Sequence, residues 1–399
     1  MREMKDSGIE WIGTIPKNWK LLRIQYGLYE IKENNTLKKT SQVLSLVKDN
    51  GVMLYEEKGN KGNKSKEDIS QYKIAYPDTL IVNSMNILIG SVGISKYTGC
   101  VSPVYYVFKE TEQTDLRYIN YIFNTREFQK ELRKYSNGIL EIRLRVSAND
   151  IFKRKIPFPN KQTQKLIADF LDQKCSEIDA LTADIQTQIK TLEEYKKSVI
   201  TEAVTKGLDP NVEMKDSGVE WVGKIPKDWG VIPVKFCFSI TNGSDPKSDE
   251  GDTPVYGSGK GHFKTCKEFK KGPTVLLGRK GTVNIPQWIE GNYWNVDTAF
   301  DVHAKGNYLL KLFFYAASCF DYDNYSTQTA LPSMTQSNYL NFRIPFMNVE
   351  EQRQIVDFLD QKCAEIDQTI SEKQQQLETL AEYKKSLIYE YVTGKKEVA

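Results

Sequence analysis

The sequence lacks several patterns that mark whole classes of protein. Its 399 residues include only two histidines and six scattered cysteines, with no Cys-x-x-Cys pair. Neither a zinc site nor a disulfide framework is therefore expected, and a reducing, cytoplasmic compartment fits. No stretch reaches the roughly 18 apolar residues of a membrane span, and the first ten residues are charged, so we expect no span and no apolar leader.

Catalytic motifs are missing as well. The sequence has no Asn- or Asp-Pro-Pro-aromatic tetrapeptide, the element with which an amino-methyltransferase would hold a flipped base. The run GSGKG at residues 257–261 lacks the spacing of a phosphate-binding loop. Glu-Tyr-Lys triplets at Glu194 and Glu382 match half of a nuclease signature, without an acidic cluster beside them in the sequence. We therefore expect a protein that is not an enzyme and carries no cofactor.

One feature that is present is repetition. The string MKDSGIEWIGTIPKNW at residues 4–19 returns as MKDSGVEWVGKIPKDW at residues 214–229, with 12 of the 16 letters identical. A longer block at residues 156–207 returns 188 positions later, at residues 344–395. The regions enclosed by these blocks share no comparable identity. The chain is thus a duplicated frame that holds two different inserts.

The long repeats have the pattern of coiled-coil helices. Asn160 and Asn348 are predicted N-caps, and Gly207 and Gly394 are predicted to end the helices. In the first copy, apolar residues recur every seven positions, and two further residues lie three positions on from that row: Leu171, Ile178, Ile185, Leu192 and Val199, then Leu181 and Tyr195. A helix of about 40 residues is roughly 60 Å long. It cannot bury such a stripe alone, so we expect the two copies to pair.

The two inserts follow a similar plan. Each begins with a β-rich part, in which valine, isoleucine and tyrosine alternate with glycine turns. Each continues with a helix, predicted at residues 115–134 with Thr114 as its cap and at residues 308–320. A short segment then leads into Ile-Pro-Phe and the long repeat. The expected fold class is mixed α/β, with two globules mounted on a coiled coil.

Charge separates the first insert from the helices. The net charge is +8 for residues 1–155, −2 for 156–212, +1 for 213–343 and −4 for 344–399. The first insert contains the lysine-rich run KGNKGNKSK at residues 58–66, and flexible lysines of this kind suit contacts with phosphates. A solvated surface loop is the alternative interpretation of this run.

These features resemble the specificity subunit of type I DNA restriction-modification systems. The resemblance is carried by SGIEWIGTIPKNW and SGVEWVGKIPKDW, by IADFLDQKCSEID and IVDFLDQKCAEID, by EEYKKSVI and AEYKKSLI, and by LLGRKGT in the second insert. It covers essentially the whole chain, in the order of the family.

The resemblance implies two target-recognition domains that each read one half of an asymmetric, bipartite site in double-stranded DNA. An antiparallel coiled coil of the two long helices would hold them apart with pseudo-two-fold symmetry. The expected boundaries are residues 1–155 and 213–343 for the recognition domains, and 156–212 and 344–399 for the spacer helices. The family implies no chemistry in this subunit, and partners that comprise two adenine-methylating modification subunits and, for cleavage, two ATP-driven restriction subunits.

Candidate contact residues follow from the family together with side-chain chemistry. Arginine suits guanine edges because its donors form a fork, whereas lysine suits phosphates. The candidate DNA contacts are Lys61, Lys64, Lys66, Arg143 and Arg145 in the first insert, and Lys260, Lys264, Arg279 and Lys280 in the second. The candidate contacts with modification subunits are Phe170, Tyr195, Phe358 and Tyr383, for which packing between the helices is an equal alternative.

The tryptophans of the short repeats have a different expected role. Trp11, Trp19, Trp221 and Trp229 are predicted to pack each recognition domain onto the far end of the opposite repeat's helix, rather than to stack on bases. The competing hypothesis for the whole chain is a coiled-coil adaptor that binds no DNA. A salt-dependent DNA-binding assay separates the two.

Overall fold

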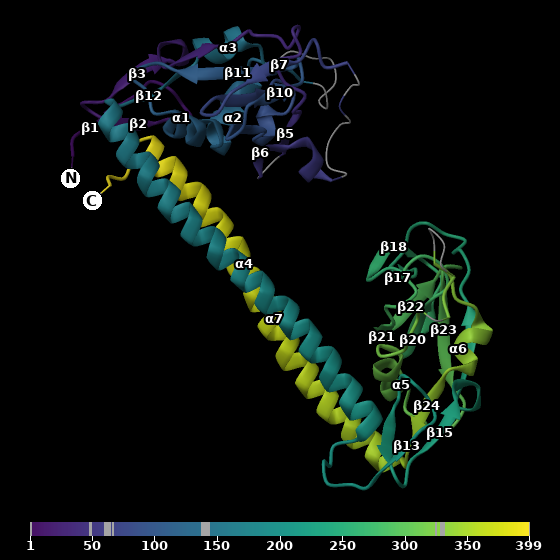
Figure 1. Ribbon diagram of the computed structural model, residues 1–399. Helices are drawn as coiled ribbons and strands as arrows, with labels where there is room; N and C mark the ends of the chain where they lie inside the picture. The colour runs from purple at the N-terminus through teal and green to yellow at the C-terminus, as the bar shows by residue number, and fades with distance from the viewer. Residues whose placement is uncertain are drawn as a thin grey trace. The chain divides into compact units, whose positions relative to one another are not determined.

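The computed structural model describes residues 2–47, 50–59, 65, 68–136, 144–323, 325–327 and 332–398 (Figure 1). The chain forms two units: unit 1 consists of Met1–Asp184 and Gln375–Ala399, and unit 2 consists of Ile185–Gln374. Each unit combines one insert with segments of both long helices. Across the described ranges, no helix is long and apolar enough to span a membrane.

The two long helices, α4 (Lys161–Lys206) and α7 (Val349–Val392), begin and end where the sequence predicts. The side chain of Asn160 accepts a hydrogen bond from a backbone N–H of the first turn of α4 at 2.8 Å, and Asn348 does the same in α7 at 2.9 Å. Gly207 and Gly394 follow the last turns with φ of +75° and +72°, a left-handed conformation that glycine adopts without a Cβ clash. The predicted caps and stops are confirmed. At 46 residues, α4 is about 69 Å long, somewhat longer than predicted.

The helices α4 and α7 pack side by side and antiparallel (Figure 1). In unit 1, Lys384 of α7 lies 2.6 Å from Asp179 of α4. In unit 2, Lys196 of α4 lies 2.6 Å from Asp367 of α7. The two ion pairs join equivalent positions of the repeat with the roles of the helices exchanged. The predicted pairing of the long repeats is therefore confirmed.

The seam between the helices differs in one respect from the prediction. Leu171, Ile178 and Ile185 are buried as expected, but Leu181 and Tyr195 are 47% and 49% exposed. The second row of the seam lies four positions after the first rather than three, as buried Cys175 shows. A step of four places a side chain on the other flank of the stripe from a step of three, so the predicted second row points away from the partner helix.

Unit 1 is built around a four-stranded antiparallel sheet in the order β4-β11-β8-β9. Its strands are β4 (Leu28–Glu30), β8 (Leu80–Asn83), β9 (Val92–Ile94) and β11 (Tyr105–Glu110). Four strand pairs flank it: β1 (Met4–Asp6) with β2 (Thr14–Pro16), β3 (Lys20–Arg23) with β12 (Lys155–Phe158), β5 (Leu44–Val47) with β6 (Gly51–Leu54), and β7 (Lys73–Ala75) with β10 (Gly99–Val101). The β-rich start of the first insert is confirmed.

Unit 2 repeats the same sheet order, β16-β23-β20-β21, although the inserts share no comparable sequence. These strands are β16 (Phe238–Asn242), β20 (Thr274–Gly278), β21 (Gln287–Ile289) and β23 (Ala299–Ala304). A second sheet, in the order β18-β17-β22-β19, contains β17 (Thr253–Tyr256), β18 (His262–Cys266), β19 (Lys270–Lys271) and β22 (Asn292–Asn295). The pairs β13 (Met214–Asp216) with β14 (Lys224–Pro226) and β15 (Gly230–Pro233) with β24 (Arg343–Phe346) match the frame strands of unit 1.

The predicted helix at residues 115–134 is two helices, α1 (Leu116–Phe123) and α2 (Arg126–Arg133). Thr125 between them is extended and caps α2 through its hydroxyl, which breaks the run. The cap of α1 is Asp115, not Thr114. Unit 2 has one helix at the equivalent place, α5 (Leu310–Ala317), and α3 (Ala148–Lys153) and α6 (Gln336–Asn341) precede the entry strands of the long helices.

Three of the four tryptophans of the short repeats, Trp11, Trp19 and Trp229, are buried in the two cores, and Trp221 is partly buried at the edge of the second core. In unit 1, Trp11 is buried beside Phe128, and its carbonyl accepts a hydrogen bond from Tyr389 near the end of α7. In unit 2, Trp229 is buried and packs against Gly207 at the end of α4. The first short repeat therefore holds the end of the second long helix, and the second short repeat holds the end of the first. The prediction of packing is confirmed for Trp11, Trp19 and Trp229, whereas Trp221 packs on Phe320 and donates to the Arg343 carbonyl of its own insert.

Candidate nucleic-acid interface

Each insert is fixed to the start of its own long helix by the same buried side chain. In unit 1, Gln164 accepts a hydrogen bond from the Asp115 N–H at 3.0 Å and donates to the Pro159 carbonyl at 2.9 Å. In unit 2, Gln352 accepts from the Leu309 N–H at 2.8 Å and donates to the Met347 carbonyl at 3.0 Å. Because a buried amide without partners is costly, these bonds fix how each insert meets the helix.

A second contact is repeated about two turns further along each long helix. Tyr121 of α1 donates to the Asp172 carboxylate at 2.7 Å, and Tyr315 of α5 donates to Asp360 at 2.5 Å. Burial, followed by the hydrogen bond to the neighbouring carboxylate, raises the pKa of both tyrosines, so the hydroxyls keep their protons. The duplicated frame thus orients two different inserts through equivalent bonds.

The predicted contacts of the second insert lie in unit 2, on the turn between β17 and β18, within β18, and directly after β20. Lys260 is exposed in the turn between β17 and β18. Lys264 of β18 is paired with Asp249 at 2.9 Å, and this hydrogen bond raises the pKa of the lysine. Arg279 and Lys280 directly follow β20, where Arg279 donates to the Asp297 carbonyl at 3.2 Å and Lys280 is exposed.

Two contacts bring the Lys260 turn close to Arg279. Buried Gln287 of β21 donates to the Gly257 carbonyl at 2.9 Å and accepts from the Gly261 N–H at 3.0 Å, so it closes the 257–261 turn from both ends. Gly257 lies against the Thr298 side chain, and the Thr298 carbonyl accepts the Arg279 N–H at 2.7 Å. The structure therefore gathers Lys260, Arg279 and Lys280 at one region of unit 2.

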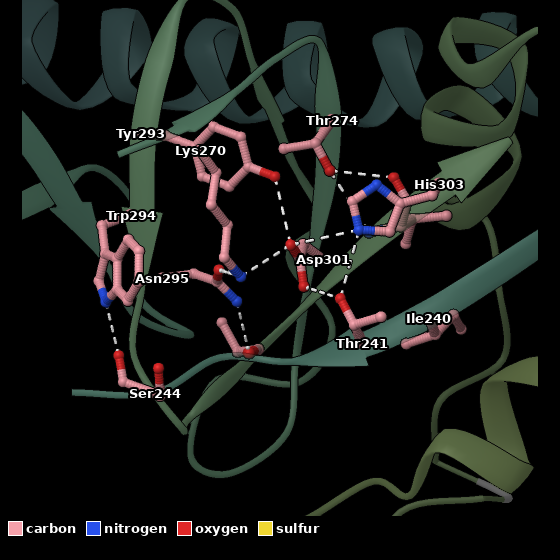
Figure 2. A network of polar contacts seen from close by, with 12 residues as sticks. Ile240, Thr241, Ser244, Lys270, Thr274, Tyr293, Trp294, Asn295, Asp301 and His303 are labelled. Carbon is pink, nitrogen blue, oxygen red and sulfur yellow. Dashed lines mark hydrogen bonds and ion pairs between the residues drawn. The ribbon is translucent and has the colours of Figure 1, made fainter. Parts of the chain in front are cut away.

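A buried polar network joins the two sheets of unit 2 (Figure 2). Asp301 of β23 is 1% exposed and lies 2.9 Å from Lys270 of β19, which also donates to Asn295 of β22 at 2.7 Å. Thr241 of β16 donates to the same carboxylate, and His303 lies 3.4 Å from it. Lys270 is therefore held inside the domain and is not free for an outside partner.

The protonation state of this network follows from its contacts. Burial by itself would raise the pKa of Asp301, but the hydrogen bonds from Thr241 and Lys270 outweigh burial and leave the pKa below its ordinary value. The carboxylate is consequently charged at neutral pH. The ionised Asp301 thus joins the small sheet to the main sheet through Lys270, in addition to the bonds of Gln287 with the Lys260 turn.

The structure describes one of the five predicted contacts of the first insert. Lys61, Lys64, Lys66 and Arg143 lie outside the described residues. Arg145 is described and is exposed, two residues before the cap of α3.

The four aromatic residues predicted to meet partner subunits differ in their surroundings. Phe170 packs on Tyr391 with ring centroids 4.4 Å apart, so internal packing accounts for part of its surface. Its repeat counterpart Phe358 is 40% exposed, because Ala203 stands where unit 1 has Tyr391. Tyr195 and Tyr383, at equivalent positions, are 49% and 51% exposed.

Sequence reasoning missed two exposed aromatic residues near the predicted lysines of unit 2. Phe263 on β18 and Phe269 just before β19 are 61% and 62% exposed. The signal was present as the alternation of aromatic and basic residues in HFKTCKEFKK, a composition that suits stacking on bases or sugars beside phosphate contacts. Within the ranges that the structure describes, no group of three or more His, Cys, Asp or Glu side chains is placed to hold a metal ion.

Comparison with known proteins identifies the family. The profile of the family described as "Type I restriction modification DNA specificity domain" matches residues 16–191 and again residues 226–379. The chain belongs to this family. Both matches span an insert together with part of a long helix, so the family repeat coincides with the duplicated frame. The recognised resemblance and the predicted architecture, two mixed α/β inserts with a pair of long helices, are therefore confirmed.

Two relatives from the type I specificity family match most of the chain. The putative type I restriction enzyme MjaX specificity subunit of Methanocaldococcus jannaschii is 24% identical, with 96% of this chain and 95% of the relative covered. The MjaVIII specificity subunit of the same organism is also 24% identical, over 79% of this chain and 80% of that protein.

Two solved structures are similar in fold. One is a chain from a study of complex assembly and conformational transition of the type I R-M system, with a TM-score of 0.75, 13% identity, and coverage of 96% of this chain and 99% of that one. The other is the HsdS subunit from Thermoanaerobacter tengcongensis, with a TM-score of 0.55, 15% identity, and coverage of 98% and 100%.

Proposed function

We propose that this chain is the non-catalytic DNA-reading subunit of a type I restriction-modification complex. Each insert reads one half of an asymmetric, bipartite site in double-stranded DNA. The recognition domains comprise residues 1–155 and 213–343, and residues 156–212 and 344–399 form the spacer helices. The complex is completed by two adenine-methylating modification subunits and, for cleavage, by two ATP-driven restriction subunits.

The observation that carries this proposal is the repeated anchoring of two different inserts. Gln164 and Gln352 make the same pair of backbone bonds, and Tyr121 and Tyr315 bind equivalent aspartates. A frame that orients different surfaces identically suits two half-sites of different sequence, presented to two copies of the same enzyme subunit. An adaptor without DNA readout would not need two different inserts in equivalent mounts.

In unit 2, the proposed readout surface contains Lys260, Lys264, Arg279 and Lys280, with Phe263 beside them. Arg279 is the candidate for a guanine edge, and the lysines are candidates for phosphates. In unit 1, the proposed DNA contacts are Arg145 and four residues outside the described ranges, Lys61, Lys64, Lys66 and Arg143. Tyr195, Tyr383, Phe170 and Phe358 are proposed to meet the modification subunits.

The test is a methylation map. The chain is expressed with its modification subunit in a host without adenine methylation, and N6-methyladenine is located in genomic DNA by long-read sequencing. One asymmetric motif, made of two half-sites with a fixed gap, is expected. A complex that forms but methylates no defined motif would refute the proposal and favour the adaptor.

A further inference from the structure

Unit 1 contains a groove whose charged lining residues are mostly cationic. It has a volume of about 1150 Å³ and runs between α2 and the C-terminal part of α7. Five cationic side chains line it: Arg126, Lys130 and Arg133 from α2, and Lys384 and Lys385 from α7. Among the described residues of its wall, Asp179 is the acidic one and is paired with Lys384, while Lys385 is paired with Glu382 at 2.6 Å, so the cations without an ion pair are those of α2. We call this feature the α2–α7 groove.

The helix α2 is built to present these charges. Its cations are spaced at four and three positions, so they share one face, while Phe128 and Leu132 on the other face are buried in the core. Arg126, Lys130 and Arg133 are all exposed, and none of them makes an ion pair within 4.0 Å in the described part of the chain. Like charges on one face repel each other, and a bound polyanion would relieve that repulsion.

Two kinds of polyanion fit such a groove: the sugar-phosphate backbone of DNA and an acidic segment of a partner protein. A surface for one of two identical partner subunits should occur in both units, because the frame is duplicated. The lysines of α7 do recur, as Lys196 and Lys197 of α4. In unit 2, however, the described residues between α5 and α6 form no helix that corresponds to α2.

The cations of α2 therefore occur in one unit only. Under the proposed function, the two units differ in the DNA half-site that each one reads, so these cations fit a contact with DNA better than a contact with a duplicated partner. The net charge agrees: +8 for the segment that contains the first insert, against +1 for the segment that contains the second. Phosphate contacts in protein–DNA complexes come mainly from arginine, lysine and neutral polar side chains, and Asn50 and Asn120 supply the last kind here.

We propose that the α2–α7 groove binds the sugar-phosphate backbone of duplex DNA next to the half-site of unit 1, without reading its sequence. This inference rests on the proposed function and deepens it. The α2 residues strengthen DNA binding and fix the position of the duplex, whereas other residues of the insert read the bases. Half-site 1 is accordingly bound with a stronger salt dependence than half-site 2.

The test compares two triple variants of the full chain in complex with its modification subunit. Arg126→Gln, Lys130→Gln and Arg133→Gln together remove the α2 charges, and glutamine maintains helix propensity. The matched control, Lys20→Gln, Arg23→Gln and Lys165→Gln, removes three other exposed charges of unit 1 that lie outside the groove. The affinity for duplexes of about 40 base pairs, with and without the mapped motif, is measured by fluorescence anisotropy from about 50 to 300 mM NaCl.

Removal of the α2 charges is expected to weaken binding to both duplexes at least about tenfold near 100 mM salt. The slope of log affinity against log salt should become shallower by about 2 to 3, since each lost phosphate contact contributes about 0.9. The methylated motif should stay the same. The control variant should change this slope by less than about 0.5. The double variant Arg126→Lys with Arg133→Lys should keep most of the wild-type affinity, because it retains the positive charges that the glutamine variant loses.

Three results would overturn the inference. An unchanged slope in a complex that binds its motif would show that DNA does not occupy the groove, while leaving the proposed function intact. Loss of the modification subunit on gel filtration would show that the groove holds that protein. A changed motif would show that α2 reads bases. If the wild-type complex binds no DNA at all, the proposed function fails and this inference fails with it.

Discussion

At the scale of single residues, Asp301 shows how a buried charge can hold two sheets of one domain together. Its carboxylate collects hydrogen bonds from β16 and β19, and so ties the small sheet of unit 2 to the main one (Figure 2). A buried charge is tolerated only where its partners are complete, because desolvation otherwise dominates. The network is complete here, which explains why a charged side chain occupies the centre of strand β23.

Replacing this aspartate should loosen the readout surface. Asp301→Asn is expected to lower the free energy of unfolding by about 2 kcal/mol, because it leaves Lys270 without its charged partner. Asp249→Asn serves as the control, since Asp249 is 87% exposed and pairs only at the surface. Chemical denaturation of the two variants measures the difference, and equal costs for both would contradict the central role of Asp301.

The same network predicts a direction of pH dependence. The pKa of Asp301 is lower in the folded chain than in the unfolded one, so its contribution is fully present above the unfolded pKa of about 4 and is lost as the pH falls through the folded value. The stability gap between wild type and Asp301→Asn should therefore narrow on acidification. A gap that widens below pH 4 would mean that the pKa is raised instead.

At the scale of elements, the ends of the long helices carry the attachment of the short repeats. Gly394 closes α7 with φ of +72°, and a Cβ there would lie 2.6 Å from the Pro16 ring and 2.9 Å from Trp19. The glycine thus has two tasks: it permits a left-handed turn, and it leaves room for the first short repeat. Gly8 has a similar φ of +66° but no atom near its Cβ position.

Alanine substitutions at these two glycines distinguish the cost of backbone strain from the cost of disturbed packing. Gly8→Ala is expected to cost about 1 kcal/mol, the strain of alanine in the left-handed region. Gly394→Ala should cost that amount plus a further 1 to 3 kcal/mol or so, because Pro16 and Trp19 must move apart. Thermal unfolding of the full chain compares them. Equal shifts in Tm would show that the short repeat does not pack tightly on the end of α7.

At the scale of the whole molecule, the proposed function assigns the spacing between the two half-sites to the helices α4 and α7. Under the proposed function, the length of α4, about 69 Å, corresponds to at most about 20 base pairs of DNA, so half-sites of several pairs would leave a gap of several more. Gln188 of α4 and Lys373 of α7 face each other at 2.5 Å, which identifies matched positions for lengthening both helices.

Insertion of four residues after both Gln188 and Lys373 adds about 6 Å and should lengthen the gap in the methylated motif by one or two base pairs, with both half-sites retained. Four residues inserted after Leu208, beyond the end of α4, are the control and should leave the gap unchanged. Methylation mapping determines the motif of the wild-type chain, of the double insertion and of the control insertion. An altered half-site, or a gap that ignores the helix length, would refute the idea of a helical ruler.

The sequence by itself determined the parts that depend on local chemistry and on repetition. Asn160, Asn348, Gly207 and Gly394 mark the ends of the long helices because caps and stops act within a turn, and the duplicated strings reveal the frame without any knowledge of contacts. Only the tertiary structure decided which charges are free. Lys270 and Arg126 look alike in a list of basic residues, yet Lys270 faces a buried carboxylate on a strand 31 positions away and Arg126 faces solvent in a groove. Long-range partners of this kind come from strand order and helix pairing, which short-range patterns do not encode.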